Sequence, residues 1–123
     1  MKQTPKSGTI MMSENKRLLA RYDDAIQNYA KLLASAINSG GAGEIGYDLI
    51  QASVTVDQRR EMALPFAEGW MLEYIAVATN MIRALVSAVS NADQVSSERV
   101  VTSVSAYESL RAKNFTAADF EDQ

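Results

Sequence analysis

One apolar segment, Met62 to Val89, constrains the fold of this chain more than any other part. Its 28 residues carry three charges, Glu68, Glu73 and Arg83. At about 100° per residue its polar side chains fall within one arc of about 140°, so the wider remainder of a helical surface is apolar. The segment predicts a central helix whose apolar face is covered by the rest of the chain, by another copy or by a partner.

The same segment is long enough to cross a bilayer, which is the alternative interpretation. A membrane-spanning helix would hold Glu73, Asn80 and Arg83 near the hydrocarbon centre, where each charge costs about 2.5 to 3.5 kcal/mol. The first 17 residues also contain no apolar stretch of the length that a signal peptide requires. We therefore expect a soluble, cytoplasmic protein with no membrane span.

The composition indicates one folded domain and excludes many kinds of chemistry. The chain has 123 residues, of which 47% are hydrophobic, so it can form a real core. It contains no cysteine and no histidine. These absences remove thiolate nucleophiles, cysteine-based metal sites, and the residue most used for acid–base work near neutral pH. We predict that the protein is not an enzyme and uses no cofactor or metal.

The clearest amphipathic helix is predicted from Glu14 to about Asn38, with Ser13 at its N-cap. Apolar residues recur every three or four positions along it: Leu18, Leu19, Tyr22, Ile26, Tyr29, Leu33, Ala36 and Ile37. The other face carries side chains suited to water: Lys16, Arg17, Asp23, Asp24, Gln27, Lys31 and Ser35. Residues 1–12, with Pro5 and Gly8, are predicted to form a flexible basic arm.

The middle of the chain allows more than one assignment. Asn38 and the glycines that follow it end the first helix, after which residues 44–53 fit a short helix and residues 53–56 an extended segment. Thr55 and Gln58 have the spacing of a capping box.

The capping box predicts a helix from Val56 to about Ser90. Pro65 disturbs that helix, because its ring clashes with the carbonyl four residues back. The segment is therefore either one kinked helix or two helices with a break near residues 62–64.

The last helix is predicted from Asp93 to Lys113, after a capping-box pattern at Asn91 and Gln94. Its core residues are Val100, Val104, Tyr107 and Leu110. The β-branched residues in 99–107 favour a competing strand assignment, which lacks a partner strand. Residues 114–123, acidic with two phenylalanines, form either a solvated tail, which we favour, or a short docking motif.

Two motif matches carry no chemistry in this context. Residues 41–46 match the glycine pattern of dinucleotide-binding folds, but they follow a helix rather than a strand and lack any βαβ signal. Residues 13–16 match a serine–lysine pattern of acyl-transfer enzymes whose other motifs are missing. We interpret the first as a helix connection and the second as a helix cap.

Charge is unevenly distributed along the chain. Residues 1–21 hold five basic side chains against Glu14, a net charge of +4, although the whole chain carries −3. The basic residues are Lys2, Lys6, Lys16, Arg17 and Arg21. We expect no nucleic-acid binding from an acidic chain without a recognisable reader motif. The basic segment either binds an acidic surface, such as that of a neighbouring copy, or simply solubilises the chain.

Together these patterns predict an all-α fold, a small bundle of three to four helices in residues 13–113 around a long central helix that Pro65 either kinks or divides in two. Three amphipathic elements hardly cover so broad an apolar helix, so we expect self-association. The predicted interface combines core anchors with the basic residues: Trp70, Tyr74, Met81, Ile82, Lys2, Lys6, Lys16, Arg17 and Arg21.

Three functions fit this description. The first is a non-enzymatic assembly or adaptor protein that self-associates, as a structural component of a larger particle. The second is a small inhibitor or regulator that binds one macromolecular target through its charged faces. The third is a small-ligand binder that uses the bundle interior, lined by Trp70, Tyr74 and methionines.

Overall fold

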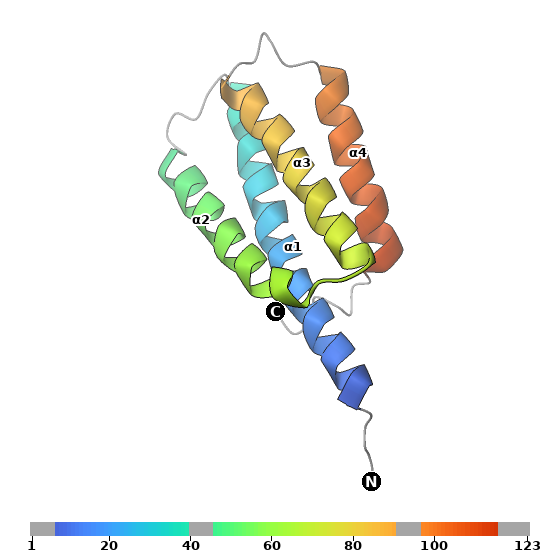
Figure 1. Ribbon diagram of the computed structural model, residues 1–123. Coiled ribbons are helices and arrows are strands. Elements are labelled where there is room, and N and C mark those ends of the chain that lie inside the picture. Colours follow the sequence, from blue (N-terminus) through green and yellow to red (C-terminus); the bar gives the residue numbers. More distant parts are fainter. Residues whose placement is uncertain (1–6, 40–45, 91–96, 116–123) are drawn as a thin grey trace.

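The protein is a bundle of four α-helices in the computed structural model, which describes residues 7–39, 46–90 and 97–115 (Figure 1). The helices are α1 (Ser7–Ser39), α2 (Gly46–Ala63), α3 (Trp70–Ser90) and α4 (Ser97–Asn114), with a short 3₁₀ helix, η2 (Leu64–Phe66), after α2. These described residues contain no strand. The predicted all-α bundle is therefore confirmed.

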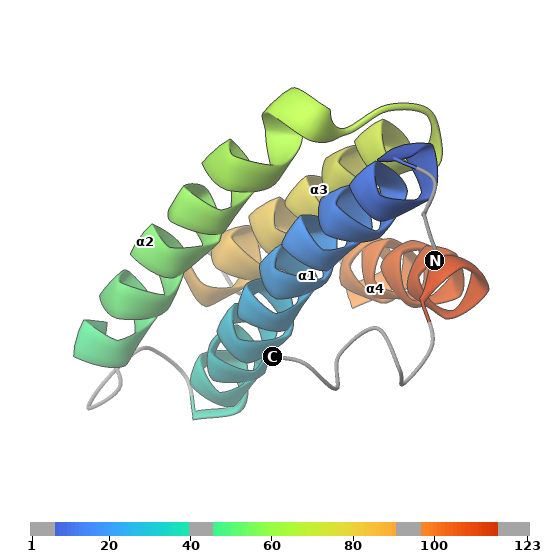
Figure 2. The same ribbon diagram turned by 90° about the horizontal axis from the view of Figure 1, so that it is seen from below.

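The helices alternate in direction, with α1 and α3 running one way and α2 and α4 the other (Figure 1). α1 packs against α2 and α3, and α3 packs against α4. Seen from below, α2 and α4 lie on opposite sides of the α1–α3 pair (Figure 2). The two longest helices, α1 and α3, thus form the centre, and each shorter helix covers one side of it.

The core follows the predicted stripes. In α1 the buried side chains include Leu19, Tyr22, Ile26 and Leu33, with Leu18 and Tyr29 partly buried against them. In α3 the buried residues recur at helical spacing: Met71, Tyr74, Ile75, Ala78, Met81, Ala84, Leu85 and Ala88. In α4, Tyr107 is buried and Val100, Val104 and Leu110 pack partly against the core.

The length and composition of α3 would suffice for a membrane span. Its polar arc nevertheless faces solvent, with Glu73, Asn80 and Arg83 all exposed. Its apolar side packs on α1 and α4.

Two predicted helix starts are wrong. α1 begins at Ser7, so Ser13 lies inside the helix and residues 7–12, assigned to the arm, are helical. α2 runs unbroken through residues 53–56, which are not extended. Thr55 is not an N-cap, because its Oγ1 donates a hydrogen bond to the Gln51 carbonyl at 3.0 Å, one turn back within α2.

The predicted helix over residues 56–90 is two helices. The break lies at residues 64–69, slightly beyond the predicted position, where Pro65 is the middle residue of the 3₁₀ helix and Gly69 adopts a left-handed φ of 56°. Residues 99–107 are helical, so the competing strand is wrong. α4 begins at Ser97 among the described residues; the predicted start at Asp93 and the capping pattern at residues 91–94 lie outside them.

Gly69 is the residue that allows α3 to begin directly after this break. We expect Gly69→Ala to lower the free energy of unfolding by about 1–2 kcal/mol, since a side chain disfavours the left-handed region by that amount. Gly46→Ala is the matched control, because Gly46 has no positive φ and no atom within 4 Å of an added Cβ. Chemical denaturation of both variants measures the difference, and equal stabilities would contradict the role given to Gly69.

Candidate functional site

A carboxylate lies in the centre of the core. Asp23 on α1 is fully buried, 0% exposed. It follows Leu19 by four residues and precedes Ile26 by three, so the helix places it on the buried stripe. Its assignment to the water-facing side of the helix is therefore wrong, and this spacing was the signal that could have revealed it.

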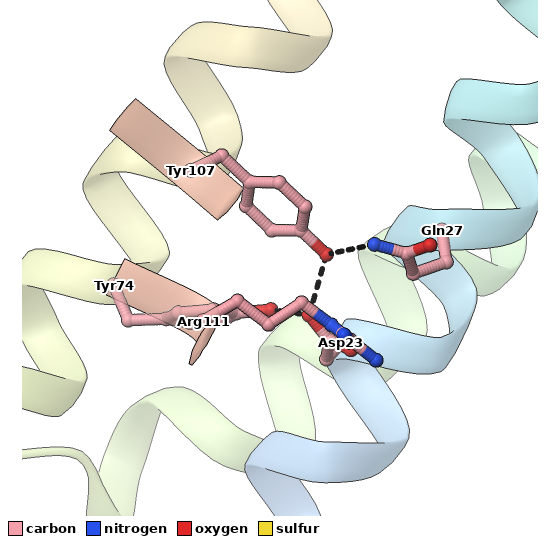
Figure 3. Close-up of polar contacts among 5 residues, drawn as sticks. All are labelled: Asp23, Gln27, Tyr74, Tyr107 and Arg111. Carbon is pink, nitrogen blue, oxygen red and sulfur yellow. Dashed lines mark hydrogen bonds and ion pairs between the residues drawn. The ribbon is translucent and has the colours of Figure 1, made fainter. Parts of the chain in front are cut away.

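Three donors converge on this carboxylate from two other helices (Figure 3). The hydroxyls of Tyr74 on α3 and Tyr107 on α4 both donate to Oδ1, the latter at 2.5 Å. The Nε of Arg111, one turn after Tyr107, donates to Oδ2 at 2.7 Å. Gln27 of α1 completes the network by donating from Nε2 to the Tyr107 hydroxyl at 3.0 Å. We call these five residues the Asp23 network; it joins α1, α3 and α4.

The electrostatics of the network keep its tyrosines protonated. Burial is the main reason that the pKa of Tyr74 and that of Tyr107 are raised, and the negative charge of Asp23 raises both further. Burial is the largest single effect on Arg111 and lowers the pKa of its guanidinium, but the hydrogen bond to Asp23 and the nearby negative charge together outweigh burial and raise that pKa. Both hydroxyls are thus available as donors at neutral pH, and the arginine balances the carboxylate charge.

The arrangement is suited to holding helices together rather than to reacting. Asp23 and Tyr74 are fully buried and Tyr107 is 1% exposed, so a substrate could not reach them without opening the bundle. Across the described part of the chain, no group of three or more acidic, histidine or cysteine side chains could hold a metal ion. The Asp23 network is a structural clamp made of charge-assisted hydrogen bonds.

An aromatic cluster extends the clamp towards the end of α4. Phe115 is 6% exposed. The centre of its ring lies 5.7 Å from that of Trp70 and 5.4 Å from that of Tyr74, and both pairs pack edge to face. The ammonium of Lys16 lies 5.8 Å from the centre of the same ring. The prediction of a solvated tail from residue 114 is therefore wrong at Phe115, because aromatic contacts bury it; residues 116–123 lie outside the described residues.

The predicted interface residues are scattered rather than gathered on one surface. Tyr74 and Met81 are buried in the chain's own core, and Trp70 and Ile82 are partly buried against it. Neither Tyr74 nor Met81 could meet a second copy unless the core opened.

The basic part of the predicted interface is only partly described. Arg17 pairs with Glu14 at 3.4 Å on the surface of α1, and Arg21 is half-buried. Lys2 and Lys6 lie outside the described residues. The participation of these residues in an interface stays a prediction.

A row of exposed apolar side chains runs along the outer face of α2. Tyr47, Ile50 and Val54 are 71%, 62% and 46% exposed. They are spaced by three and four residues, so they lie on one side of the helix, whereas Ala52, Val56 and Ala63 are buried. Met62 continues the outer row at the other end of α2, 50% exposed. Sequence analysis missed this row because the helix that displays it could not be assigned.

Comparison with known proteins adds no relative: no family model, curated protein or solved structure matches this chain.

The clamp predicts a large effect of a small change at Asp23. In Asp23→Asn the amide NH₂ replaces one acceptor oxygen, which leaves a buried donor facing a donor. We expect a loss of about 3 kcal/mol in the free energy of unfolding. Asp24→Asn is the control, since Asp24 is the exposed neighbour and should change stability by under about 0.5 kcal/mol. Urea titrations followed by circular dichroism would measure both, and equal values would rule out the clamp.

The raised tyrosine pKa values predict alkaline instability. A tyrosine whose folded pKa lies above its unfolded value of about 10 contributes stability that is complete below pH 10 and is lost as the pH rises further. The free energy of unfolding should therefore fall from about pH 10 upwards, and fall less steeply in Tyr107→Phe. Denaturation at a series of pH values, with tyrosine ionisation followed by absorbance, tests this. An unchanged slope in Tyr107→Phe would contradict it.

Proposed function

We propose that this protein is a non-enzymatic assembly component that self-associates through the outer face of α2. The observation that carries the proposal is the exposed apolar row of Tyr47, Ile50, Val54 and Met62, which no other described element covers. Single exposed apolar residues are ordinary, but a helical row of them is typical of an interaction surface.

The position of α2 supports contact with a second copy. α2 lies at the side of the bundle, held mainly by α1, and its outer face points away from the other helices (Figure 2). Leu64 and Phe66 in η2 are also about half exposed and add apolar surface at the end of α2. Two copies could therefore bring their α2 helices together without changing either bundle.

Charge along α2 favours an antiparallel pair. Asp48 and Arg59 are 11 residues apart, about three helical turns, so they lie on the same flank of the helix. The midpoint between them is next to Val54, in the middle of the apolar row. A two-fold axis at that point would place Asp48 of each copy level with Arg59 of the other at the rim of the contact, since both lie about 100° to 140° round the helix from Tyr47 and Val54. Within the described residues neither side chain has an ion-pair partner in its own chain.

A charge exchange tests this pairing. Asp48→Arg and Arg59→Asp each place like charges together twice in a two-fold dimer, so each should weaken dimerisation by about tenfold. The double variant recreates both attractions in reverse and should restore wild-type association. Sedimentation equilibrium from about 1 to 500 µM at low salt measures the dissociation constants.

The same series contains its own controls. Asp24→Arg makes an equal charge change on the exposed surface of α1 and should leave association unchanged. Circular dichroism shows whether each variant keeps its helices. A wild-type protein that is monomeric at every concentration would reject self-association. A dimer that none of the α2 changes affects would reject this surface.

A further inference from the structure

A cavity of about 170 Å³ lies between α1, α2 and α3, and none of the five residues of the Asp23 network lines it. One part of its wall is apolar and is made by Ile26, Val56 and Ile82, one from each helix. The other part is polar and includes Arg60, Thr79 and Arg83. Its volume resembles that of a cavity of about 150 Å³ known to bind benzene, so it suits a ligand with one small ring.

The Tyr22 hydroxyl provides the second observation. Tyr22 lines this cavity and is fully buried. Its ring packs edge to face on that of Tyr74, with 6.2 Å between the ring centres. Its hydroxyl has no hydrogen-bond partner among the described residues. A buried hydroxyl without a partner is unfavourable, so the position calls for a group that completes its hydrogen bonding.

The surroundings of this hydroxyl place it on the polar side of the cavity. Burial is the main cause of the raised pKa of Tyr22, while Thr79 and Arg60 lower that pKa and Asp57 raises it. All three are cavity-lining residues. Thr79 donates its own hydroxyl proton to the Ile75 carbonyl at 2.7 Å, so towards Tyr22 it can act only as an acceptor. Its side chain lowers the pKa of Tyr22 as a hydrogen-bonding neighbour, but no hydrogen bond of ordinary geometry joins the two hydroxyls.

The charge around the cavity favours an anion. Arg60 forms an ion pair with Asp57 at 3.0 Å, so these two charges balance each other. Arg83 has no ion-pair partner within the described ranges and reaches solvent. The cavity wall therefore carries one positive charge in excess beside an apolar surface.

We propose that this cavity binds a small aromatic or aliphatic monocarboxylate. The apolar body of the ligand lies against Ile26, Val56 and Ile82. Its carboxylate accepts hydrogen bonds from Arg83 and, where the ligand widens the cavity at the buried Tyr22, from the Tyr22 hydroxyl. This site is independent of the outer face of α2 that is proposed for self-association.

Three matched probes test the charge preference on the full-length protein. Benzoate carries the ring and the charge, benzamide the ring without the charge, and inorganic phosphate the charge without the ring. Isothermal titration calorimetry should give saturable binding of one benzoate per chain, with benzamide and phosphate each at least about tenfold weaker, since a charged hydrogen bond or a buried ring contributes that much.

Two variants locate the binding. Arg83→Gln, at an exposed position, should weaken benzoate about tenfold, and Tyr22→Phe, which removes only the hydroxyl, about threefold. Lys113→Gln removes one positive charge from the exposed surface of α4 and should leave benzoate binding unchanged. Amide chemical shifts of residues in 53–60 and 79–83 should move on addition of benzoate.

The outcomes separate the possibilities. Saturable benzoate binding that both cavity variants weaken supports the site. If none of the three probes binds, water alone completes the hydrogen bonding of the Tyr22 hydroxyl, and the proposal is overturned. Equal binding of benzamide would overturn the preference for an anion, and binding unaffected by both variants would place benzoate elsewhere. Sedimentation of the benzoate-saturated protein measures whether benzoate changes the oligomeric state, so that ligand binding is judged separately from self-association.

Discussion

The bundle depends on one buried carboxylate. Asp23 is taken out of water completely, a cost that is compensated because three donors from two other helices surround it. Apolar packing alone would allow α4 to slide or rotate on the α1–α3 pair. The directional bonds of Tyr107 and Arg111 remove that freedom, since both must reach the same carboxylate. The register of α4, and with it the burial of Phe115, follows from this requirement.

The fold was predictable where a long periodic pattern dominates. The stripes of α1 and α3 carry enough apolar residues at helical spacing to define their buried faces, and the core confirms them. The ends of helices were less predictable, because Ser13 and Thr55 match cap patterns while lying inside helices. At Thr55 a bond to the preceding turn satisfies the side chain, and a short motif cannot distinguish this from a cap.

The clamp could be anticipated only in part. The position of Asp23 between Leu19 and Ile26 indicates burial, but its partners lie more than 50 residues away on helices whose register the sequence does not reveal. The outer row of α2 was missed for a related reason, since a helix with apolar residues on two sides has little periodicity. Sequence reasoning therefore searched for an interface on the apolar central helix, most of whose apolar face the rest of the chain covers.

The attachment of α2 has a consequence for the dynamics of the bundle. The Asp23 network ties α1, α3 and α4 together but includes no side chain of α2, which is held chiefly by packing on α1. α1 and α2 share the most extensive contact between two helices, but no bond of the network holds α2, so we expect it to detach at a lower free energy than the other three helices need to separate. Backbone amides of α2 would then exchange hydrogen with solvent through a local opening, whereas those in the middle of α3 would exchange only when the whole bundle unfolds.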